Sequence, residues 1–401
     1  MPEITEANST IIKLAGFDFW KTALGAARLV VAPMVDQSEL AWRLLSRRHG
    51  AQLCYTPMLN SKIFVKHAAY RQREFQTCAE DHPLIAQFCG DDPETLLEAA
   101  CMVEDQVEGI DLNLGCPQHI ARKGHYGSYL QDEWDLIERI VSTLHKGLKV
   151  PITVKIRVFD NVERTVAYAR MIEAAGAQLL TVHGRLRDQK GHEAGLADWD
   201  KIRAVKEALK IPVFANGNIL FRDDIERCQE ETGADGVMVA EGNLFNPAIF
   251  EDNLTPMWTL VEEYLDIVKT VPNSASLTAV RGHLFKLFRP ALSRFVDHRT
   301  RLGTAKSFSE IEGVAKELNA LLISVATEET IANRSLDNLE ELPFWVCQPY
   351  VRDHNLYRVN RGLVALPLEV ASAGKRQGIE RISNDPICEE PILKSLKCCT
   401  E

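Results

Sequence analysis

A buried strand and an abrupt turn meet in the stretch Asp111-Leu112-Asn113-Leu114-Gly115-Cys116-Pro117. The apolar run that begins at Ile110 predicts the strand. Pro117 cannot donate to a strand ladder and Gly115 permits an unusual backbone turn, so the strand ends there. The pattern places the Cys116 thiol on a loop at the carboxyl end of a strand. Such a cysteine is more often structural than catalytic, because a buried cysteine usually behaves as a small apolar residue.

Short aliphatic runs of the same kind recur along the chain, each followed by a turn and an amphipathic helix. The eight runs are residues 29–34, 53–58, 84–88, 110–115, 152–157, 179–184, 213–217 and 236–240. Runs that are apolar on both faces are typical of parallel strands covered by helices. The pattern predicts an α/β fold, a (β/α)8 TIM barrel. A doubly wound open sheet is the alternative, but the chain lacks the G-x-G-x-x-G turn of dinucleotide-binding sheets.

Capping residues mark the helices between these runs. One helix begins with Asp92 as N-cap, followed by a proline, and is expected to end at Gly109. Another is expected to start from Ser38 as cap and to end at Gly50. The longer, polar segment 62–82 predicts an excursion inserted between the second and third strands.

The same patterns divide the chain into four parts. These are a lead-in over residues 1–28, the barrel over 29–255, a helical domain over 256–352, and a polar tail over 353–401 that we expect to be largely disordered. In the helical domain, apolar periodicity predicts helices over residues 257–270, 280–297 and 308–326. Pro290 lies inside the second of these and should kink or divide it.

The composition is that of a globular protein, with 46% hydrophobic residues, 25% charged residues and a net charge of −10. This acidic balance argues against a surface that coats nucleic acid throughout, but it leaves room for a local basic patch. Ten cysteines without a C-x-x-C pair indicate neither a disulfide framework nor a zinc site. No signal peptide or membrane span is visible, so we expect an intracellular protein, cytoplasmic or nuclear.

Polar residues recur where the predicted strands end. In strand order they are Pro33-Met34-Val35-Asp36, Gln87, Asn113 with Cys116, Lys155 with Arg157, His183 with Arg185, Asn216-Gly217-Asn218 and Ala240-Glu241-Gly242-Asn243. Each has a structural alternative: Gln87 can plug the barrel, Lys155 can face solvent, and His183 can be a hydrogen-bonded core residue. An apolar barrel core does not need polar groups at seven strand ends, and their burial is unfavourable without a partner. Active sites of such barrels lie at the carboxyl ends of the strands, so we interpret the set as a ligand site.

The last two strand ends indicate the kind of ligand. Loops after the seventh and eighth barrel strands commonly bind phosphate through backbone N–H groups. Gln87 and Lys155 are suited to the polar edge of a planar ring, and the Lys155 cation would stabilise the negative charge that a flavin gains on reduction. Flavin mononucleotide (FMN) meets these demands.

With these motifs the chain resembles the tRNA-dihydrouridine synthases, and among them the eukaryotic branch that acts on D-loop uridines 16 and 17. The resemblance runs through the barrel and on to about residue 352. It rests on the motifs Val31-Ala32-Pro33-Met34-Val35-Asp36, Leu112-Asn113-Leu114-Gly115-Cys116-Pro117, Val154-Lys155-Ile156-Arg157, Thr181-Val182-His183-Gly184-Arg185 and Phe214-Ala215-Asn216-Gly217-Asn218-Ile219. It implies reduction of the uracil 5,6 double bond with bound FMN, and with NADPH or NADH as the reductant.

The resemblance also implies roles for single residues. FMN contacts are implied for Pro33, Met34, Val35, Gln87, Lys155, His183, Asn216, Gly217, Asn218, Ala240 and Glu241. Cys116 is implied as the proton donor, which requires a thiol rather than a thiolate, and Asn113 and Arg157 as the groups that hold the uracil edge. Many relatives have an arginine where this chain has Glu241. We therefore expect Glu241 to offer its backbone N–H to the phosphate and to turn its carboxylate away.

Basic residues gather in the predicted helical domain. Seven lysines and arginines lie between residues 281 and 306, against one acid, Asp297. Lys286, Arg289 and Arg294 fall opposite the apolar helix face, where we expect them to be exposed and to bind tRNA phosphates. A solvated helix face is the alternative. The basic segment 122–125, next to Cys116, is a second candidate contact or a lid.

Two other functions stay open. A small-molecule FMN barrel, such as a dihydroorotate dehydrogenase, has a similar Asn-x-x-Cys-Pro loop, but its substrate would not need a basic helical domain. A non-catalytic RNA-binding protein would not need Cys116, Lys155 and His183. We expect a monomer without metal or membrane contact, whose partners are tRNA and a nicotinamide dinucleotide.

Overall fold

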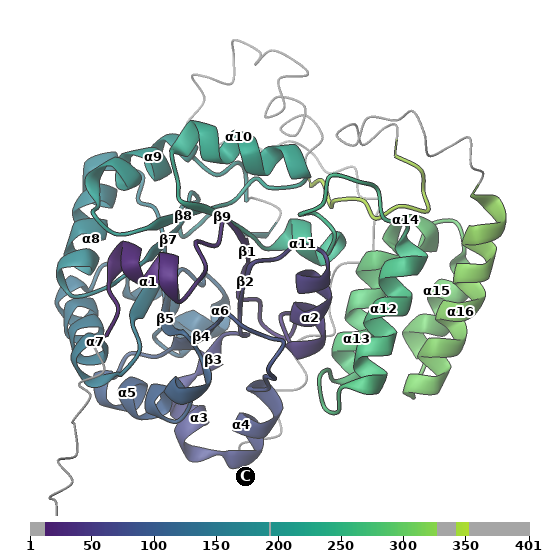
Figure 1. Ribbon diagram of the computed structural model, residues 1–401, viewed down its shortest axis with the longest axis horizontal. Helices are drawn as coiled ribbons and strands as arrows, with labels where there is room; N and C mark the ends of the chain where they lie inside the picture. The colour runs from purple at the N-terminus through teal and green to yellow at the C-terminus, as the bar shows by residue number, and fades with distance from the viewer. Residues whose placement is uncertain (1–12, 192–193, 327–341, 353–401) are drawn as a thin grey trace, which may run out of the picture. The chain divides into compact units, whose positions relative to one another are not determined.

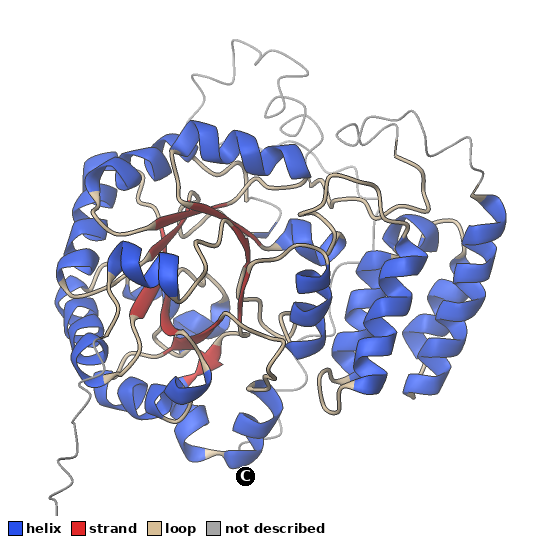
Figure 2. Ribbon diagram, in the orientation of Figure 1, coloured by secondary structure: helices blue, strands red, loops and turns tan. Residues whose placement is uncertain are grey.

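Eight parallel strands close into a barrel in the computed structural model, which describes residues 13–191, 194–326 and 342–352. Strand β1 pairs with both β9 and β2, and β2 pairs with β4, which completes the ring seen in Figure 2. The eight are β1 (Leu29–Val31), β2 (Leu53–Tyr55), β4 (Leu84–Cys89), β5 (Gly109–Leu114), β6 (Ile152–Arg157), β7 (Leu180–His183), β8 (Val213–Asn216) and β9 (Gly236–Val239). The predicted TIM barrel is confirmed. The sequence did not predict β3 (Leu59–Asn60), a two-residue strand that pairs with β4.

Successive residues of each strand face opposite sides of the barrel wall. On β5, Ile110, Leu112 and Leu114 belong to the large apolar core formed with the surrounding helices. Asp111 and Asn113 are buried on the opposite face and hydrogen-bond to side chains of neighbouring strands. Because side chains alternate along a strand, these polar groups lie in the barrel interior.

Apolar side chains fill the amino end of the barrel. The short helix α1 (Gly16–Thr22) places Phe19 there, fully buried and close to Gly109 at the start of β5. Phe19 shares an apolar cluster with Leu24, Val30, Leu53, Tyr55, Ile85, Leu179, Phe214 and Met238. The predicted lead-in, described from residue 13, therefore closes the end of the barrel opposite to the predicted ligand site.

Helices cover the outside of the strands (Figure 1). They are α2 (Leu40–Arg48), α3 (Ser61–Lys66), α5 (Pro93–Cys101), α7 (Trp134–Gly147), α8 (Val162–Ala174), α9 (Trp199–Ala208) and α10 (Arg222–Thr232). Helix α4 (Ala68–Glu74) follows α3, and the 3₁₀ helix η1 (Glu104–Gln106) follows α5. Helix α6 (His119–Lys123) and the 3₁₀ helix η2 (Gly127–Leu130) lie in the segment after β5, and Figure 1 shows α6 within the outline of the ring of strands. The predicted polar excursion forms α3 and α4. The Asp92 cap is confirmed, because its carboxylate accepts a 2.9 Å hydrogen bond from the backbone N–H of Thr95.

Two predicted helix boundaries are wrong. Helix α5 ends at Cys101 and not at Gly109, because the polar residues that follow form η1 instead. Ser38 does not cap α2, whose N-cap position is occupied by Glu39. The Ser38 hydroxyl instead bonds the backbone N–H and carbonyl of Met34, and so shapes the loop after β1.

Helices follow the barrel in the remaining described chain. They are α11 (Glu241–Phe245), α12 (Met257–Thr270), α13 (Leu277–Leu287), α14 (Arg289–Leu292), α15 (Val296–Thr304) and α16 (Phe308–Val325). The helix predicted over residues 280–297 is divided, and Pro290 stands in the first turn of the short α14. This division agrees with the inability of proline to continue a helical hydrogen-bond ladder.

Helix α2 packs against the barrel on one side and against α12 and α13 on the other. Its first seven residues, 40–46, are all buried. Trp42 stacks on His283 with ring centroids 3.9 Å apart, and Glu39 accepts a 2.8 Å hydrogen bond from the Tyr264 hydroxyl. The described residues up to Arg352 belong to one compact unit, so a domain division at residues 255–256 stays a prediction. The predicted tail, residues 353–401, lies outside the described residues.

Candidate active site

The barrel brings the predicted strand-end residues together at its carboxyl end. Pairing between neighbouring strands places Asn113 beside Lys155, Arg157 beside His183, and His183 beside Asn216. Gln87 joins the same group through its hydrogen bond from the Asn113 side chain. Cys116 follows in the loop after β5.

The loop that carries Cys116 is tightly bonded. The Asn113 side-chain oxygen accepts hydrogen bonds from the backbone N–H groups of Gly115 (3.2 Å) and Cys116 (2.9 Å). The Cys116 carbonyl accepts from the backbone N–H and the hydroxyl of Ser128. Gly127 makes this approach possible, since its φ is +68° and a Cβ there would lie 2.7 Å from the Cys116 carbonyl oxygen. The position of the thiol is therefore set by the backbone on both sides of the loop.

Burial raises the pKa of the Cys116 thiol. A backbone hydrogen bond from Gln118 and the cations of Arg157 and Lys155 oppose this shift, but desolvation of the thiolate dominates. The group therefore carries its proton at neutral pH, as the sequence analysis required of a proton donor.

Lys155 is held between strands. Its Nζ donates a 2.9 Å hydrogen bond to the side-chain oxygen of Asn216, and the Asn216 amide nitrogen donates to the Met238 carbonyl. Burial lowers the pKa of Lys155 to about 8, helped by repulsion from Arg157 and opposed by Asp111. Lys155 thus remains mostly cationic at neutral pH, in a place where its charge is costly.

His183 is neutral. Burial lowers its pKa well below the ordinary range, and Lys155, Arg157 and Arg185 add to the shift. An Arg185 guanidinium nitrogen lies 3.1 Å from Nε2 of His183, and because arginine can only donate, Nε2 accepts and Nδ1 carries the proton. Arg185 also donates to the Asn218 side-chain oxygen, so it links the loops after β7 and β8.

The loop after β8 packs closely against the loops after β7 and β9. Gly217 has a φ of +116°, and a Cβ there would lie 2.6 Å from the Ala197 Cβ. A Cβ on Gly242 would lie 2.4 Å from the Ile219 carbonyl oxygen. The Asn218 amide is bonded to the backbone N–H and carbonyl of Ala197. Ala240 stands at the N-cap position of α11, ahead of Glu241.

The carboxylate of Glu241 is paired with a cation from another part of the chain. It forms an ion pair with Arg352, at the end of the described residues. Arg352 also lies over the Tyr350 ring. Glu241 is therefore neutralised by a side chain that the sequence analysis did not single out.

The Arg157 guanidinium donates three hydrogen bonds to backbone carbonyls. Its Nε donates to the Gly115 carbonyl (2.8 Å), and its Nη1 donates to those of Leu186 (2.7 Å) and Gln189 (2.9 Å). Burial lowers the pKa of Arg157 to about 10, which leaves it charged at neutral pH. Arg157 thus ties the Cys116 loop to the loop after β7, in addition to any substrate contact.

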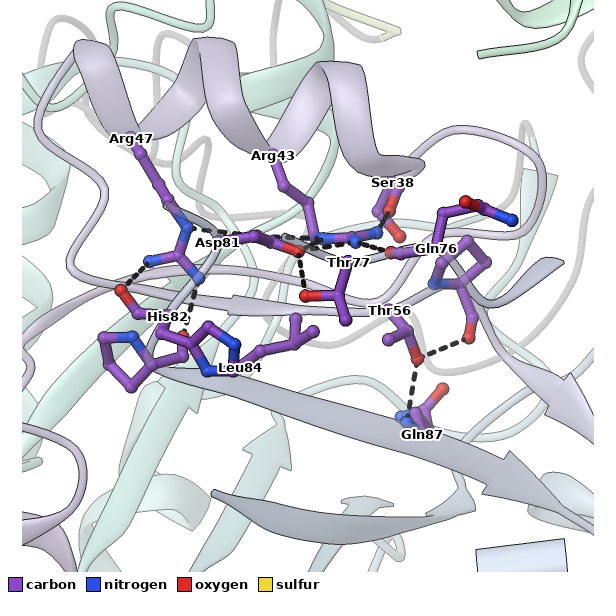
Figure 3. A network of polar contacts seen from close by, with 12 residues as sticks. Ser38, Arg43, Arg47, Thr56, Gln76, Thr77, Asp81, His82, Leu84 and Gln87 are labelled. Atoms are coloured by element: carbon purple, nitrogen blue, oxygen red, sulfur yellow. Dashed lines mark hydrogen bonds and ion pairs between the residues drawn. The ribbon is translucent and has the colours of Figure 1, made fainter. Parts of the chain in front are cut away.

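A buried charge cluster of Arg43, Arg47 and Asp81 is bonded to the loop after β1 through Ser38 (Figure 3). In this loop Pro33 and Met34 are half-buried and Val35 is exposed. Arg43 donates from two nitrogens to Asp81 and from Nη1 to the Ser38 carbonyl. Arg47 donates to the same carboxylate. Arg43 and Asp81 are both almost fully buried, so loss of either side chain would leave the charge of the other buried and unpaired. The sequence analysis missed this cluster, whose members lie far apart along the chain.

The predicted tRNA contacts lie in and beside α13 and α14. Arg294 is exposed and lies 4.0 Å from the centre of the Phe344 ring. Arg289 and Lys286 are half-buried rather than exposed, and Arg289 lies over both Phe245 of α11 and Tyr350. The expected fully exposed face is therefore wrong for two of the three residues.

No cluster of three or more histidine, cysteine, aspartate or glutamate side chains suited to a metal ion occurs among the described residues. In the same residues, no helix is long and apolar enough to cross a membrane.

Comparison with known proteins gives matches along most of the chain. The family profile described as dihydrouridine synthase (Dus) matches residues 30–329. The chain is 53% identical over 342 residues to a Mus musculus protein named tRNA-dihydrouridine(16/17) synthase-like, covering 85% of this chain and 71% of that protein. It is 45% identical over 396 residues to the Saccharomyces cerevisiae tRNA-dihydrouridine(16/17) synthase, covering 90% and 93%.

A human protein named tRNA-dihydrouridine(20a/20b) synthase-like matches less of the chain. It is 40% identical over 245 residues, which cover 59% of this chain and 76% of that protein. The family profile and the relatives of higher identity and coverage show that the chain belongs to the dihydrouridine synthase family.

Proposed function

We propose that the chain is an FMN-dependent tRNA-dihydrouridine synthase that reduces the uracil 5,6 double bond of D-loop uridines 16 and 17. The mouse and yeast relatives are named for dihydrouridine at these two positions. The observation that carries the proposal is Cys116, a thiol kept protonated by burial at the polar end of the barrel. A proton donor in this place is what reduction of a carbon–carbon double bond requires.

The residues at the carboxyl end fit FMN. Lys155 is a half-buried cation that donates to a neutral partner, Asn216, so its charge remains available to an electron-rich ring edge. Gly217 and Gly242 let the loops after β8 and β9 pack closely against Ala197 and the Ile219 carbonyl. Loops in this position of a barrel commonly bind phosphate. When bound, FMN supplies the hydride for C6 of the uracil. Pro33, Met34, Val35, Gln87, Lys155 and His183 would hold its ring, and Asn216, Gly217, Asn218, Ala240 and Glu241 its phosphate side.

The protein's own contribution to the chemical step is positioning and a proton. Asn113 and Ser128 fix the backbone of Cys116, and Arg157 fixes the carbonyl next to it. The thiol proton goes to C5 of the uracil, and the Lys155 cation stabilises negative charge that develops nearby. Asn113 and Arg157 would hold the uracil edge with the hydrogen-bonding capacity they retain. NADPH or NADH would supply the electrons from the same open end.

Binding of tRNA requires basic side chains, because a uridine must be extruded from the folded RNA at a cost of a few kcal/mol. Lys286, Arg289 and Arg294 would supply phosphate contacts near the barrel. The rings of Phe245, Tyr350 and Phe344 lie beneath the two guanidinium groups. This stacking limits the side-chain entropy lost on binding and leaves N–H edges for phosphate oxygens.

The test is dihydrouridine formation in unmodified tRNA by the purified full-length protein with NADPH, mapped to single positions by mass spectrometry. We expect dihydrouridine at positions 16 and 17, and loss of product in the Cys116→Ala variant. Cys101→Ala is the matched control, because Cys101 is an exposed cysteine on α5 and should leave the activity unchanged. A flavin-loaded, NADPH-oxidising protein that makes no dihydrouridine would instead favour a small-molecule barrel.

A further inference from the structure

Asp111 is a fully buried carboxylate with no role in the mechanism above. It faces the barrel interior on β5, two residues before Asn113. The Thr153 hydroxyl donates to one of its oxygens at 2.6 Å, and the Gln87 amide nitrogen donates to the other at 2.8 Å. Among the described residues no cation lies at ion-pair distance, although Lys155 acts on it electrostatically.

A directed chain of hydrogen bonds runs from Asp111 to Cys116. Gln87 donates its amide nitrogen to Asp111 and accepts through Oε1 from the Asn113 amide nitrogen at 2.8 Å. Asn113 in turn accepts through Oδ1 from the backbone N–H of Cys116 at 2.9 Å. An ionised carboxylate can only accept and a backbone N–H can only donate, so the two ends of the chain require the same orientation of both amides.

We propose that Asp111 is a positioning residue, which orients the side-chain amides of Gln87 and Asn113 and through them holds the Cys116 backbone in place. The part of this proposal that concerns catalysis rests on the proposed function. Removal of the carboxylate leaves the buried Gln87 amide nitrogen without its acceptor. The Gln87 side-chain amide would then rotate toward another hydrogen-bond acceptor. This rotation would move Oε1 of Gln87 away from the Asn113 amide nitrogen, which donates to it.

The electrostatics agree with an ionised Asp111 at neutral pH. Burial raises the pKa of Asp111 to about 6, while the hydrogen bonds from Thr153 and Gln87 and the charge of Lys155 oppose the shift. The carboxylate therefore keeps its acceptor-only character at physiological pH. The polar chain has a defined direction under the conditions in which the enzyme would act.

Two substitutions separate the acceptor function from the charge. Asp111→Asn keeps an oxygen for Gln87 and can donate to the Thr153 hydroxyl, which then turns its proton toward the Ile110 carbonyl at 3.4 Å. Asp111→Leu has a similar size but no acceptor. Val154→Ala is the control for lost stability, because Val154 packs in the outer core and is not part of the chain of amides.

The measurement is the rate at which iodoacetamide alkylates Cys116 in the purified holoprotein, followed by peptide mass spectrometry, together with kcat and KM for tRNA. We expect Asp111→Leu to change the alkylation rate several-fold and to lower kcat about tenfold, because a displaced catalytic group loses rate steeply. Asp111→Asn should stay within about twofold of the wild type in both values. Val154→Ala should lower the melting temperature only.

The proposal is overturned if Asp111→Leu matches Val154→Ala in alkylation and kcat, or if Asp111→Asn is as impaired as Asp111→Leu. Should Asp111→Leu not fold, Gln87→Met breaks the same chain from its other side and should alter the alkylation rate in the same way. Failure of the proposed function is separate: it would appear as absence of dihydrouridine with the wild-type protein, while the alkylation comparison would still report on the chain of amides.

Discussion

The two ends of the barrel interior are built from opposite kinds of side chain. The amino end is an apolar cluster in which Phe19, Phe214 and Met238 are fully buried. The carboxyl end brings together a thiol, a lysine, an arginine and a histidine from the neighbouring strands β5, β6 and β7 and the loop after β5. Burial of this second group shifts pKa values toward the uncharged forms, which is an unfavourable contribution to folding.

This difference separates stability from function within a single barrel. Apolar packing at the amino end contributes free energy of folding without chemical specificity. The polar end contributes little to stability, because its side chains are oriented to bind a ligand. It therefore depends on the free energy of folding that apolar packing supplies at the amino end. Removal of a side chain at the amino end should therefore lower stability and spare activity, whereas removal of a charged group at the carboxyl end should lower activity and spare stability.

The largest effect is expected at the amino end. Phe19→Ala removes a fully buried ring and should lower the free energy of unfolding by about 3–5 kcal/mol. Chemical denaturation followed by circular dichroism measures this loss. Turnover per folded molecule should stay the same, and a large loss of turnover in the folded fraction would contradict the separation of the two ends.

An apolar substitution at the carboxyl end should do the reverse. Lys155→Met removes a half-buried charge that desolvation disfavours, so the melting temperature should be unchanged or higher. Dihydrouridine formation should fall by about 100-fold or more, because a cation aimed at developing charge is lost. A variant with a lower melting temperature and full activity would show that Lys155 is structural.

Titration of Asp111 should contribute to the change of the free energy of unfolding with pH. Its pKa is about 6 in the native protein, against an ordinary value of 3.8, so the native state binds more protons than the unfolded state between these values. The contribution of Asp111 to the free energy of unfolding therefore decreases as pH rises from about 4 to about 6. Asp111→Asn should remove this component, as denaturation at several pH values would reveal. An identical slope in both proteins would mean that Asp111 titrates normally.

The smallest effect is expected outside the barrel. Arg294→Ala should weaken tRNA binding a few-fold and reduce the slope of log affinity against log salt by about 1, as for one lost phosphate contact. Arg301→Ala is the matched control, because that guanidinium is already paired with Glu317 through two hydrogen bonds. Equal salt slopes for Arg294→Ala and the wild type would exclude Arg294 as a phosphate contact.

The sequence was sufficient to predict the barrel and the end at which its polar residues gather. The strand positions follow from apolar runs that alternate with amphipathic helices, and the site follows from the rule that parallel strands deliver their last residues to one face. The protonated state expected of Cys116 agrees with the direction of its pKa shift. These features depend on local pattern, which a single sequence contains.

Hydrogen-bond partners could not be predicted, because they depend on strand register and on contacts distant in sequence. Arg43 and Asp81 are 38 residues apart, and nothing in either segment identifies the other. The family resemblance implies a substrate contact for Arg157, yet three of its hydrogen bonds go to backbone carbonyls. Asp111 could have been noticed, since it shares a strand face with Asn113 two residues later, but its partners on β4 and β6 are set by register.

The central claim, that Cys116 acts as the acid in uracil reduction and not in folding or cofactor binding, is tested most directly by separating the two half-reactions. Flavin absorbance would be followed anaerobically in Cys116→Ala, Cys101→Ala and the wild type, first on mixing with NADPH and then on mixing with unmodified tRNA. We predict flavin reduction within about twofold of the wild type, and reoxidation by tRNA slowed by about 100-fold or more in Cys116→Ala alone. Reoxidation of that variant at the wild-type rate would contradict the account.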